Sequence, residues 1–504
     1  MYQVDLDPGH QCPWKEEVTR VLRLLEQKDA ALCELQQKLE AVLVQTQSLE
    51  RRLFGPKSER LPKVEPVEKQ LRPDSEQAAR QEQGRARRRE RKALRKTMRT
   101  QTVFHPVEKE KQRCPRCGNP KLDPLGEGKN TTEYEYVPGY FVRYEHIQQK
   151  LSCRCGEYIV TADPPPRATD KSQYGPGLHA HVVVSKCADS LPLHRLAKQY
   201  SRLGIPMERS TLCDVFHATA QKLSPLSERL LQLIAQAQVV QADETPLKML
   251  SPERKGYVWT FLHQDLIGYR FSGDRSGLTP QQVLGGTPGT LVVDAYTGYN
   301  RVTQVPGRER AGCLAHARRK FFEALPTAPV EAKRALELIL EVYRVEHKAK
   351  EAGVVRTAEH LQMRQTQGRE AMERLKAWLE AEQDRHPPKS PMGEAIGYAL
   401  NQWQPLSRFL EDEKIPVDNN ASERALRVVA LGRKNFLFVG HQEAGQNLAG
   451  LYSLVATCQA HGVDPMAYLS DVLMRIDDHP AAQLDQLLPH HWTPPSAAPR
   501  AAAA

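Results

Sequence analysis

AQVVQADET, at residues 237–245, is the first of four short apolar runs of strand type that decide the fold. GYVWTFLHQ (256–264), IGYRFSGD (267–274) and GTLVVDAYTGY (289–299) follow, and AGCLAHARRKFFEAL (311–325) has the pattern of a strand that leads into a helix. Short runs rich in β-branched and aromatic residues predict strands. Strands interleaved with helices predict a mixed sheet flanked by helices. We therefore expect a multidomain α+β protein whose sheet domain spans residues 236–450.

Helical patterns surround these strands. In residues 170–235, LPLHRLAKQYSRLG (191–204) and IPMERSTLCDVFHATAQKL (205–223) read as two helices joined at a glycine turn. This spacing permits a DNA-reading helix-turn-helix, and it is equally compatible with a helix pair in a bundle. Long charged helices are predicted as an insertion at about 326–412, and further helices at 451–492. The low-complexity end TPPSAAPRAAAA (493–504) predicts a disordered tail.

A seven-residue repeat runs through residues 15–55. Its two apolar seams consist of Val18, Leu25, Leu32, Leu39 and Leu53, and of Val21, Leu35, Val42 and Leu49. Thr46 and Lys28 are the polar exceptions, and no turn signal interrupts the run before Gly55-Pro56. Such a repeat predicts a leucine-zipper-like coiled coil, with an amphipathic helix packed on its own domain as the alternative. A coiled coil would make the protein a homo-oligomer.

The charge of the chain favours a polyanionic partner. The 504 residues carry a formal net charge of +10, and the sequence pI is about 9.0. The basic linker 56–102 contains GRARRRERKALRKTMR (84–99), which is either a solvated linker or a sequence-independent contact to DNA phosphates. No apolar run approaches the roughly 20 residues that span a bilayer, and the N-terminus lacks a signal peptide. We therefore expect no membrane partner and a cytoplasmic location.

Four of the ten cysteines form two close pairs, Cys114-x-x-Cys117 and Cys153-x-Cys155, and six are scattered singly. Four thiolates in two pairs suit one tetrahedral structural Zn²⁺ ion, although the one-residue spacing of the second pair is unusual. His105 or His146 could replace one cysteine. TTEYEYVPGYFVRYEHIQQKLSC (131–153) predicts two strands around Pro138-Gly139. Residues 103–165 are therefore predicted to form a small β-rich zinc module, and the scattered cysteines to be plain thiols.

Three carboxylates stand out in the second half of the chain. Asp243 and Asp294 each end a strand-like run, so neighbouring strands would bring them together as hard oxygen ligands for Mg²⁺ or Mn²⁺. An aspartate after a strand also commonly just begins a turn, so the pair needs a third ligand. Glu423 is the candidate, in the first turn of a helix that Asp418, Asn419 or Asn420 would cap.

Several motifs follow one another along the chain, from residue 51 to residue 473. They are RRLFGPKSER (51–60), CPRC with CRC, QADETP (241–246), VVDAYTGY (292–299), GCLAHARRKF (312–321), DNNASERALRVVALGRKNFLF (418–438) and YSLVATCQAHGVDPMAYLSDVL (452–473). With these motifs the chain resembles the insertion-sequence-66 family of bacterial transposases. The resemblance implies an RNase H-like catalytic core of the two-aspartate, one-glutamate (DDE) type. Asp-Ala-Tyr here departs from the family's usual Asp-Gly-Tyr, but the carboxylate is kept.

The resemblance implies that Asp243, Asp294 and Glu423 hold two Mg²⁺ (or Mn²⁺) ions, with Glu443 as a rival for the third position. Two such ions can activate an attacking oxygen and stabilise a leaving oxygen in phosphodiester cleavage and strand transfer. The resemblance further implies that the substrates are double-stranded element ends and target DNA, that the protein acts at the bacterial nucleoid, and that accessory proteins of the element take part. Residues proposed to bind DNA phosphates are His316, Arg318, Arg319, Arg424, Arg427, Arg433 and Lys434.

Two other functions use the same features. A regulator that binds DNA without catalysis would explain the coiled coil and the zinc module, but it leaves the three carboxylates unexplained. A metal-dependent nuclease that cuts without joining would use the same carboxylates. The sequence does not distinguish this nuclease from a transposase.

Overall fold

The computed structural model describes residues 139–152, 159–163, 165–170, 172–304 and 307–494, with a few single positions before residue 139. The chain divides into a unit of residues 1–139 and a unit of residues 140–504, and the second contains the sheet. The predicted coiled coil (15–55), basic linker (56–102), zinc-ligand cysteines and tail lie almost wholly outside the described residues. These expectations therefore stay predictions.

The central sheet consists of β3 (Val239–Leu250), β4 (Glu253–His263), β5 (Leu266–Ser272), β6 (Gly289–Val292), β7 (Arg308–Ala311) and β8 (Phe438–Val439). Its strand order is β5-β4-β3-β6-β7, and β8 also pairs with β3. β3, β4 and β5 form an antiparallel meander, whereas β6 and β7 run parallel to β3. The mixed sheet and β3 to β6 were predicted from the sequence. The strand expected at the start of 311–325 shares only Ala311 with β7, and β8 was not predicted.

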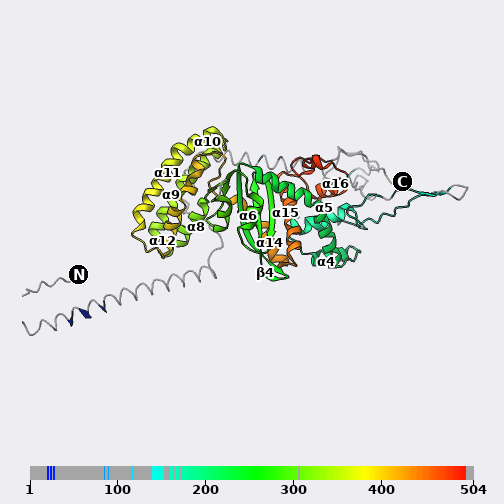
Figure 1. Cartoon of the computed structure of the whole chain (residues 1–504), viewed down its shortest axis with the longest axis horizontal. Coiled ribbons are helices and arrows are strands. Elements are labelled where there is room, and N and C mark those ends of the chain that lie inside the picture. Colours follow the sequence, from blue (N-terminus) through cyan, green and yellow to red (C-terminus); the bar gives the residue numbers. More distant parts are fainter. Residues whose placement is uncertain are drawn as a thin grey trace, which may run out of the picture. The chain divides into compact units, whose positions relative to one another are not determined.

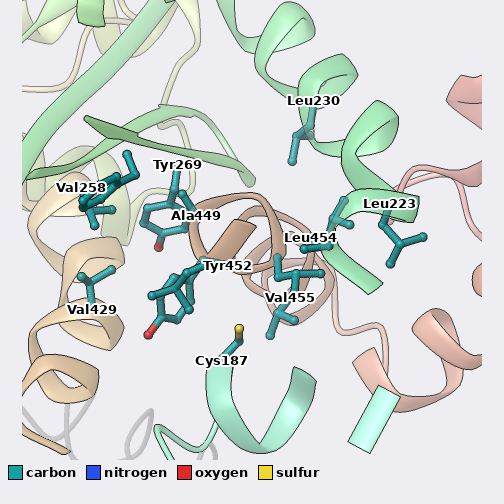
Figure 2. Close-up of a cluster of buried hydrophobic side chains, with 14 of the residues drawn as sticks. Cys187, Leu223, Leu230, Val258, Tyr269, Val429, Ala449, Tyr452, Leu454 and Val455 are labelled. Carbon is teal, nitrogen blue, oxygen red and sulfur yellow. The ribbon is translucent and has the colours of Figure 1, made fainter. Parts of the chain in front are cut away.

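Helices that precede and helices that follow the sheet in the sequence pack with it around one hydrophobic core. α3 (Pro176–Cys187), α4 (Leu193–Arg202) and α5 (Arg209–Gln236) precede it, and α14 (Asn420–Phe436), α15 (Gln442–Ala460), α16 (Pro465–Arg475) and η6 (Ala481–Leu487) come after its main strands. Figure 2 shows Leu223 of α5, Val258 of β4 and Tyr452 of α15 within one buried cluster. α4 and α5 are joined at Gly204, whose φ of +84° suits glycine, so the predicted helix, turn and helix are present. Because α5 packs into the sheet's own core, these helices do not form a separate hydrophobic core.

The predicted helical insertion follows β7 and α8 (Leu314–Ala324). It contains α9 (Pro329–Glu351), α10 (Ala358–Met363), the π-helical turn η4 (Arg364–Gly368), α11 (Arg369–Gln383), α12 (Pro391–Asn401), α13 (Trp403–Ser407) and η5 (Arg408–Leu410). Its apolar faces form a second core cluster that continues into Val292 and Ala311 of the sheet. Figure 1 shows α9, α11 and α12 gathered beyond α8, away from α15 and α16.

Smaller elements connect the sheet strands. α6 (Leu278–Leu284) lies between β5 and β6, and η3 (Thr297–Tyr299) and α7 (Asn300–Thr303) lie between β6 and β7. Cys187, Cys213, Cys313 and Cys458 are free thiols, as predicted for the scattered cysteines of the described part. None of the described helices is both long and apolar enough to cross a membrane.

One strand prediction was wrong. Residues 139–149 were predicted as a strand after a turn at Pro138-Gly139, but they have no regular structure. Tyr140, Tyr144 and Ile147 in this segment are exposed, whereas Phe141 packs edge-on against Tyr200 of α4, so the alternating residues do not share one packed face. The antiparallel pair lies later, between β1 (Lys150–Ser152) and β2 (Ile159–Thr161).

A buried arginine ties the insertion to the chain that returns to the sheet domain. The Arg364 side chain is 2% exposed and donates two hydrogen bonds, of 2.8 and 2.7 Å, to the Glu346 carboxylate. Its Nη1 also donates to the backbone carbonyls of Phe409, Asp412 and Ile415. One guanidinium therefore fixes α9, η4 and the segment that leads to α14.

We expect Arg364→Met to lower the free energy of unfolding by about 3–5 kcal/mol, because it leaves Glu346 and three carbonyls without their partner. Chemical denaturation monitored by circular dichroism measures this loss. The control is Arg374→Met in the same insertion, whose exposed pairs with Glu341 and Glu370 should contribute little. Equal stability of the two variants would contradict the role given to Arg364.

Candidate active site

Asp243 lies near the middle of β3, not at its end as the sequence suggested. β3 is parallel to β6 only over Val239–Gln241, and it continues to Leu250 as the antiparallel partner of β4. The apolar run ends at Asp243, but pairing with β4 carries the strand through the polar residues that follow. Asp243 therefore sits just beyond the point where β6 leaves β3, so one side of β3 is open to another element there.

Asp294 lies two residues after β6, in the loop that leads to η3. Its Oδ1 accepts a hydrogen bond of 2.9 Å from the backbone N–H of Tyr296. Arg310 of β7 holds the same loop by donating to the carbonyl oxygens of Asp294 and Tyr296, at 3.2 and 3.1 Å. Because β3 and β6 are neighbours, both aspartates lie at the same edge of the parallel ladder.

Glu423 lies in the first turn of α14, as predicted, and Asn419 fixes the start of that helix against β3. The Asn419 side chain is buried, and its Nδ2 donates to the carbonyl of Ala242 at 2.7 Å. Its Oδ1 accepts from Ser422 Oγ at 2.8 Å and from Gln241 Nε2 at 3.2 Å. One carboxamide thus joins the residue before Asp243 to the residue before Glu423.

The capping expected for this helix is only partly present. Asn419 is the N-cap residue, but its side chain makes no capping hydrogen bond. Asp418 instead accepts from the backbone N–H of Asn420 at 3.1 Å and from the Tyr343 hydroxyl at 3.0 Å. The backbone N–H of Asn419 donates to the buried Cys313 sulfur at 3.1 Å. The polar residues before α14 therefore attach it to β3, α8 and α9.

The three carboxylates are close enough to interact. The pKa of Asp243 is raised to about 7, first by burial and then by the negative charge of Glu244, with further contributions from Asp294 and Glu423. A backbone hydrogen bond from Glu244, 2.8 Å long, acts in the opposite direction. The structure thus brings a buried carboxylate beside three others.

Sequence reasoning missed the role of Glu244. Its side chain is 3% exposed, and its Oε1 accepts two hydrogen bonds from Arg275, of 2.8 and 2.5 Å. The Tyr299 hydroxyl donates to Oε2 at 2.7 Å. Arg275 also lies over the Tyr296 ring, 4.0 Å from its centroid. Glu244 is therefore paired with Arg275 and links β3 to the loop that carries Asp294. Only the adjacent Asp-Glu pair in QADETP could have signalled it.

Two of the predicted phosphate-binding residues lie at the carboxylates. Arg319 Nη2 is 3.4 Å from both oxygens of Glu423, and His316 Nε2 is 3.9 Å from Glu423 Oε1. His316 Nδ1 is buried and has no hydrogen-bond partner among the described atoms. Both residues line a pocket of about 350 Å³ that also contains Asp294, Arg275, Tyr296 and Lys320.

The other predicted phosphate-binding residues lie elsewhere. Arg424, Arg427 and Lys434 are exposed and share the outer face of α14. Arg318 acts on Tyr343, where its charge lowers the pKa of the hydroxyl against the larger effect of burial. Arg433 Nη1 donates to Thr245 Oγ1 and to the Pro246 carbonyl, at 2.7 and 2.9 Å, so here it braces α14 against β3. Phosphate binding by these residues stays a prediction.

Glu443, the rival third ligand, faces a different element. It lies in the first turn of α15, and its Oε1 accepts a hydrogen bond of 3.1 Å from Gln221 Nε2 on α5. Glu423, by contrast, contributes to the raised pKa of Asp243. The geometry therefore favours Glu423.

The donor set suits a divalent cation in chemistry and charge. Carboxylate oxygens are the ligands that Mg²⁺ and Mn²⁺ prefer, and a cation would offset the repulsion that raises the Asp243 pKa. As the side chains stand, no three His, Cys, Asp or Glu residues of the described part converge as a metal-binding group. The four cysteines of the predicted zinc site, Cys114, Cys117, Cys153 and Cys155, lie outside the described residues.

Comparison with known families identifies the class of protein. Residues 171–447 match the model of the Transposase IS66 family, which includes the sheet, the insertion and all three carboxylates. Residues 453–490 match the IS66 C-terminal element, and residues 111–156 match the zinc-finger binding domain of transposase IS66. The chain therefore belongs to the IS66 family of transposases, and the resemblance inferred from its motifs is confirmed.

Similar proteins occur in Sinorhizobium fredii, where they are named only as uncharacterized proteins. The protein y4hP is 32% identical over 415 residues, which cover 76% of this chain and 74% of that protein. The protein y4jD is 35% identical over 411 residues, covering 77% and 79%. The protein y4qI is 30% identical over 392 residues, covering 73% and 72%. The family, more than these individual relatives, thus points to function.

We expect Asn419→Ala to lower the free energy of unfolding by about 2–3 kcal/mol, because it leaves the Ala242 carbonyl and the Ser422 hydroxyl without their buried partner. Urea denaturation measures the change. Asn420→Ala is the matched control, because that half-buried amide donates only locally, to Asp418. An effect no larger than that of Asn420→Ala would show that Asn419 does not hold α14 to β3.

Proposed function

We propose that this protein is a DDE transposase that cleaves and rejoins DNA at the ends of an insertion sequence. The observation that supports the proposal most is that Asp294 and Glu423 both contribute to the raised pKa of Asp243, while His316 and Arg319, which lie at Glu423, line the same pocket as Asp294. The strand order β5-β4-β3-β6-β7, antiparallel in its first three strands and parallel in the rest, supports assignment to the RNase H-like folds.

Asp243, Asp294 and Glu423 would hold two Mg²⁺ or Mn²⁺ ions. Two such ions, when bound, supply activation of the attacking oxygen and stabilisation of the leaving oxygen in an in-line displacement. The protein's own part is to hold the three carboxylates on separate elements: Asp243 on β3, Asp294 on a loop fixed by Arg310, and Glu423 on a helix fixed by Asn419. Arg275 pairs with Glu244, which would offset the repulsion between this acid and the DNA.

The pocket beside Asp294 suits the phosphate that is cut. Arg275, His316, Arg319 and Lys320 line it, and guanidinium and ammonium groups are strong partners for phosphate oxygens. The exposed cations of α14 begin one residue after Glu423. Their spacing supports contact with the DNA backbone leading away from the site, which positions DNA without reading its sequence.

The N-terminal part of the chain, up to about residue 165, would recognise and pair the DNA ends. We assign Cys114, Cys117, Cys153 and Cys155 as ligands of one structural Zn²⁺ ion, because all four lie in or at the edge of the zinc-finger match. The heptad repeat at 15–55 would join two or more copies, so that both element ends are held together. Action at the nucleoid, with accessory proteins of the same element, completes this proposal.

We expect more than about 100-fold slower cleavage and strand transfer in each of Asp243→Asn, Asp294→Asn and Glu423→Gln. Loss of a residue that only supports a metal ligand costs up to about 100-fold, so a larger loss indicates a ligand. The assay uses Mg²⁺ or Mn²⁺, DNA with the element's ends, and any accessory proteins the element encodes. Glu443→Gln is the matched control and should keep activity. An inactive Glu443→Gln with an active Glu423→Gln would move the third ligand to Glu443. Cleavage without joining of a pre-cut end would favour a nuclease.

Stability gives a second measurement that does not depend on activity. Because the pKa of Asp243 is raised to about 7 from an ordinary 3.8, its ionised form above pH 7 favours unfolding. Without metal at pH 8, Asp243→Asn should therefore raise Tm by a few degrees, and the gain should vanish below about pH 4. Mg²⁺ or Mn²⁺ should raise the Tm of the wild type more than that of the variant. Equal metal effects on both would contradict cation binding at Asp243.

Zinc binding is tested on the whole chain. We expect one Zn²⁺ per chain by elemental analysis, and its loss in Cys114→Ser, with weakened binding to the element's ends. Cys213→Ser, which changes a free thiol on α5, should keep both the zinc and the binding. Full zinc content in Cys114→Ser would remove that cysteine from the ligand set.

A further inference from the structure

A second pocket, of about 470 Å³, opens in the helical insertion next to the candidate active site. It lies among α8, the end of α11 and α12, and it shares two lining residues, Lys320 and Tyr398, with the pocket that contains Asp294. Lys320 Nζ lies 5.2 Å from the centroid of the Tyr398 ring. Tyr398 and Asp294 line the same pocket, and the negative charge of Asp294 adds to the effect of burial, which raises the pKa of Tyr398. Whatever fills the second pocket therefore lies one side chain away from the reacting centre.

The helix that forms one wall leaves room for an occupant. Gly393, Gly397 and Asn401 follow one another at four-residue intervals along α12 and line the pocket. Gly393 is packed against the backbone of Pro387, but a Cβ atom added at Gly397 would meet nothing within 4 Å. Glycine inside a helix costs about 1 kcal/mol relative to alanine. At Gly397 no packing contact accounts for this cost, and the helix borders open space there.

The lining offers hydrogen-bonding groups around an aromatic wall. Gln383 and Asn401 supply carboxamides, which both donate and accept, and Glu394 adds a carboxylate. His386 Nε2 is buried without a hydrogen-bond partner among the described atoms, although it lies 3.5 Å from Glu382 Oε2. Lys320 stands where the two pockets join. A ligand with a flat ring, polar edges and an anionic group next to that ring matches this arrangement.

The geometry points to a nucleotide of the DNA substrate as the occupant: one base next to the cleaved phosphate leaves the duplex and enters this pocket, with its phosphate at Lys320. This inference rests on the proposed function, because the DNA strand must already lie at Asp294. The volume falls within the range of small-ligand pockets. Taking a base out of the stack costs a few kcal/mol, which contacts to its edges and ring would offset. Such a base would hold the strand in register for cutting.

Gly397→Phe tests the inference by filling the pocket, and Gly397→Ala is its matched control because the added methyl leaves most of the space. DNA with the element's ends carries 2-aminopurine at one position at a time across the cleavage junction, and fluorescence is read with Ca²⁺ so that no cutting is needed. We expect a several-fold rise at one position for the wild type and Gly397→Ala, and its loss in Gly397→Phe. Cleavage by Gly397→Phe should fall about tenfold, the value of one base stack. Removing the base at that position should lower wild-type cleavage by a similar factor and should cause no further loss in Gly397→Phe.

If fluorescence rises at none of the positions while cleavage is normal, the inference is overturned and the proposed function is left intact. A rise that Gly397→Phe keeps would also overturn it. A rise without any cleavage in Mg²⁺ would instead count against the proposed function alone. If Gly397→Phe does not fold, Asn401→Leu replaces it, since Asn401 is exposed and its change removes an edge contact without filling the helix face. Unchanged fluorescence in that variant would then contradict the inference.

Discussion

The active-site arrangement depends on one buried carboxamide. Asn419 connects β3, through the Ala242 carbonyl, with the first turn of α14, through Ser422. Asp243 and Glu423 are the residues that directly follow these two contacts, so their separation is set by a short hydrogen-bonded path. The path is available because β6 leaves β3 after Gln241, which opens the side of the strand where α14 begins. A buried amide satisfied on both sides holds such a junction firmly, since each unmade bond would carry a full desolvation cost.

This junction lets the chain accommodate a long insertion between its second and third carboxylates. The insertion has its own core, but that core continues into Val292 and Ala311 of the sheet. At its end, Arg364 fixes the returning segment and Tyr343 holds Asp418, one residue before Asn419. The insertion is therefore built into the support of Glu423. Because α8 and α12 also line the two pockets, it contributes to the space in which DNA would be held.

The sequence predicted the parts of this structure that depend on local pattern. The apolar runs predicted β3 to β6, and the acidic residue in the first turn of α14 was found from its position after Asp418-Asn419-Asn420. The sequence analysis placed Asp243 at the end of a strand because the residues after it are more polar. In the structure, backbone pairing with β4 continues to Leu250. The bonds of Asn419, Arg275 and Arg310 join segments far apart in the chain, and no local pattern encodes such partners. The family motifs named the carboxylates, and only the fold shows what holds them.

The acidic residues of the candidate site differ in whether an arginine lies beside them. Glu244 is paired with Arg275 and Glu423 lies near Arg319, whereas Asp243 accepts its hydrogen bond from a backbone N–H. Burial, with the nearby charges of Glu244, Asp294 and Glu423, makes the ionised form of Asp243 costly, as its raised pKa reflects. Such an acid adds nothing to the stability of the fold at neutral pH, so a role in binding is the simpler account of it. Under the proposed function, a divalent cation would turn this repulsion into binding energy and would bring DNA phosphates to a pocket already lined by arginine, histidine and lysine.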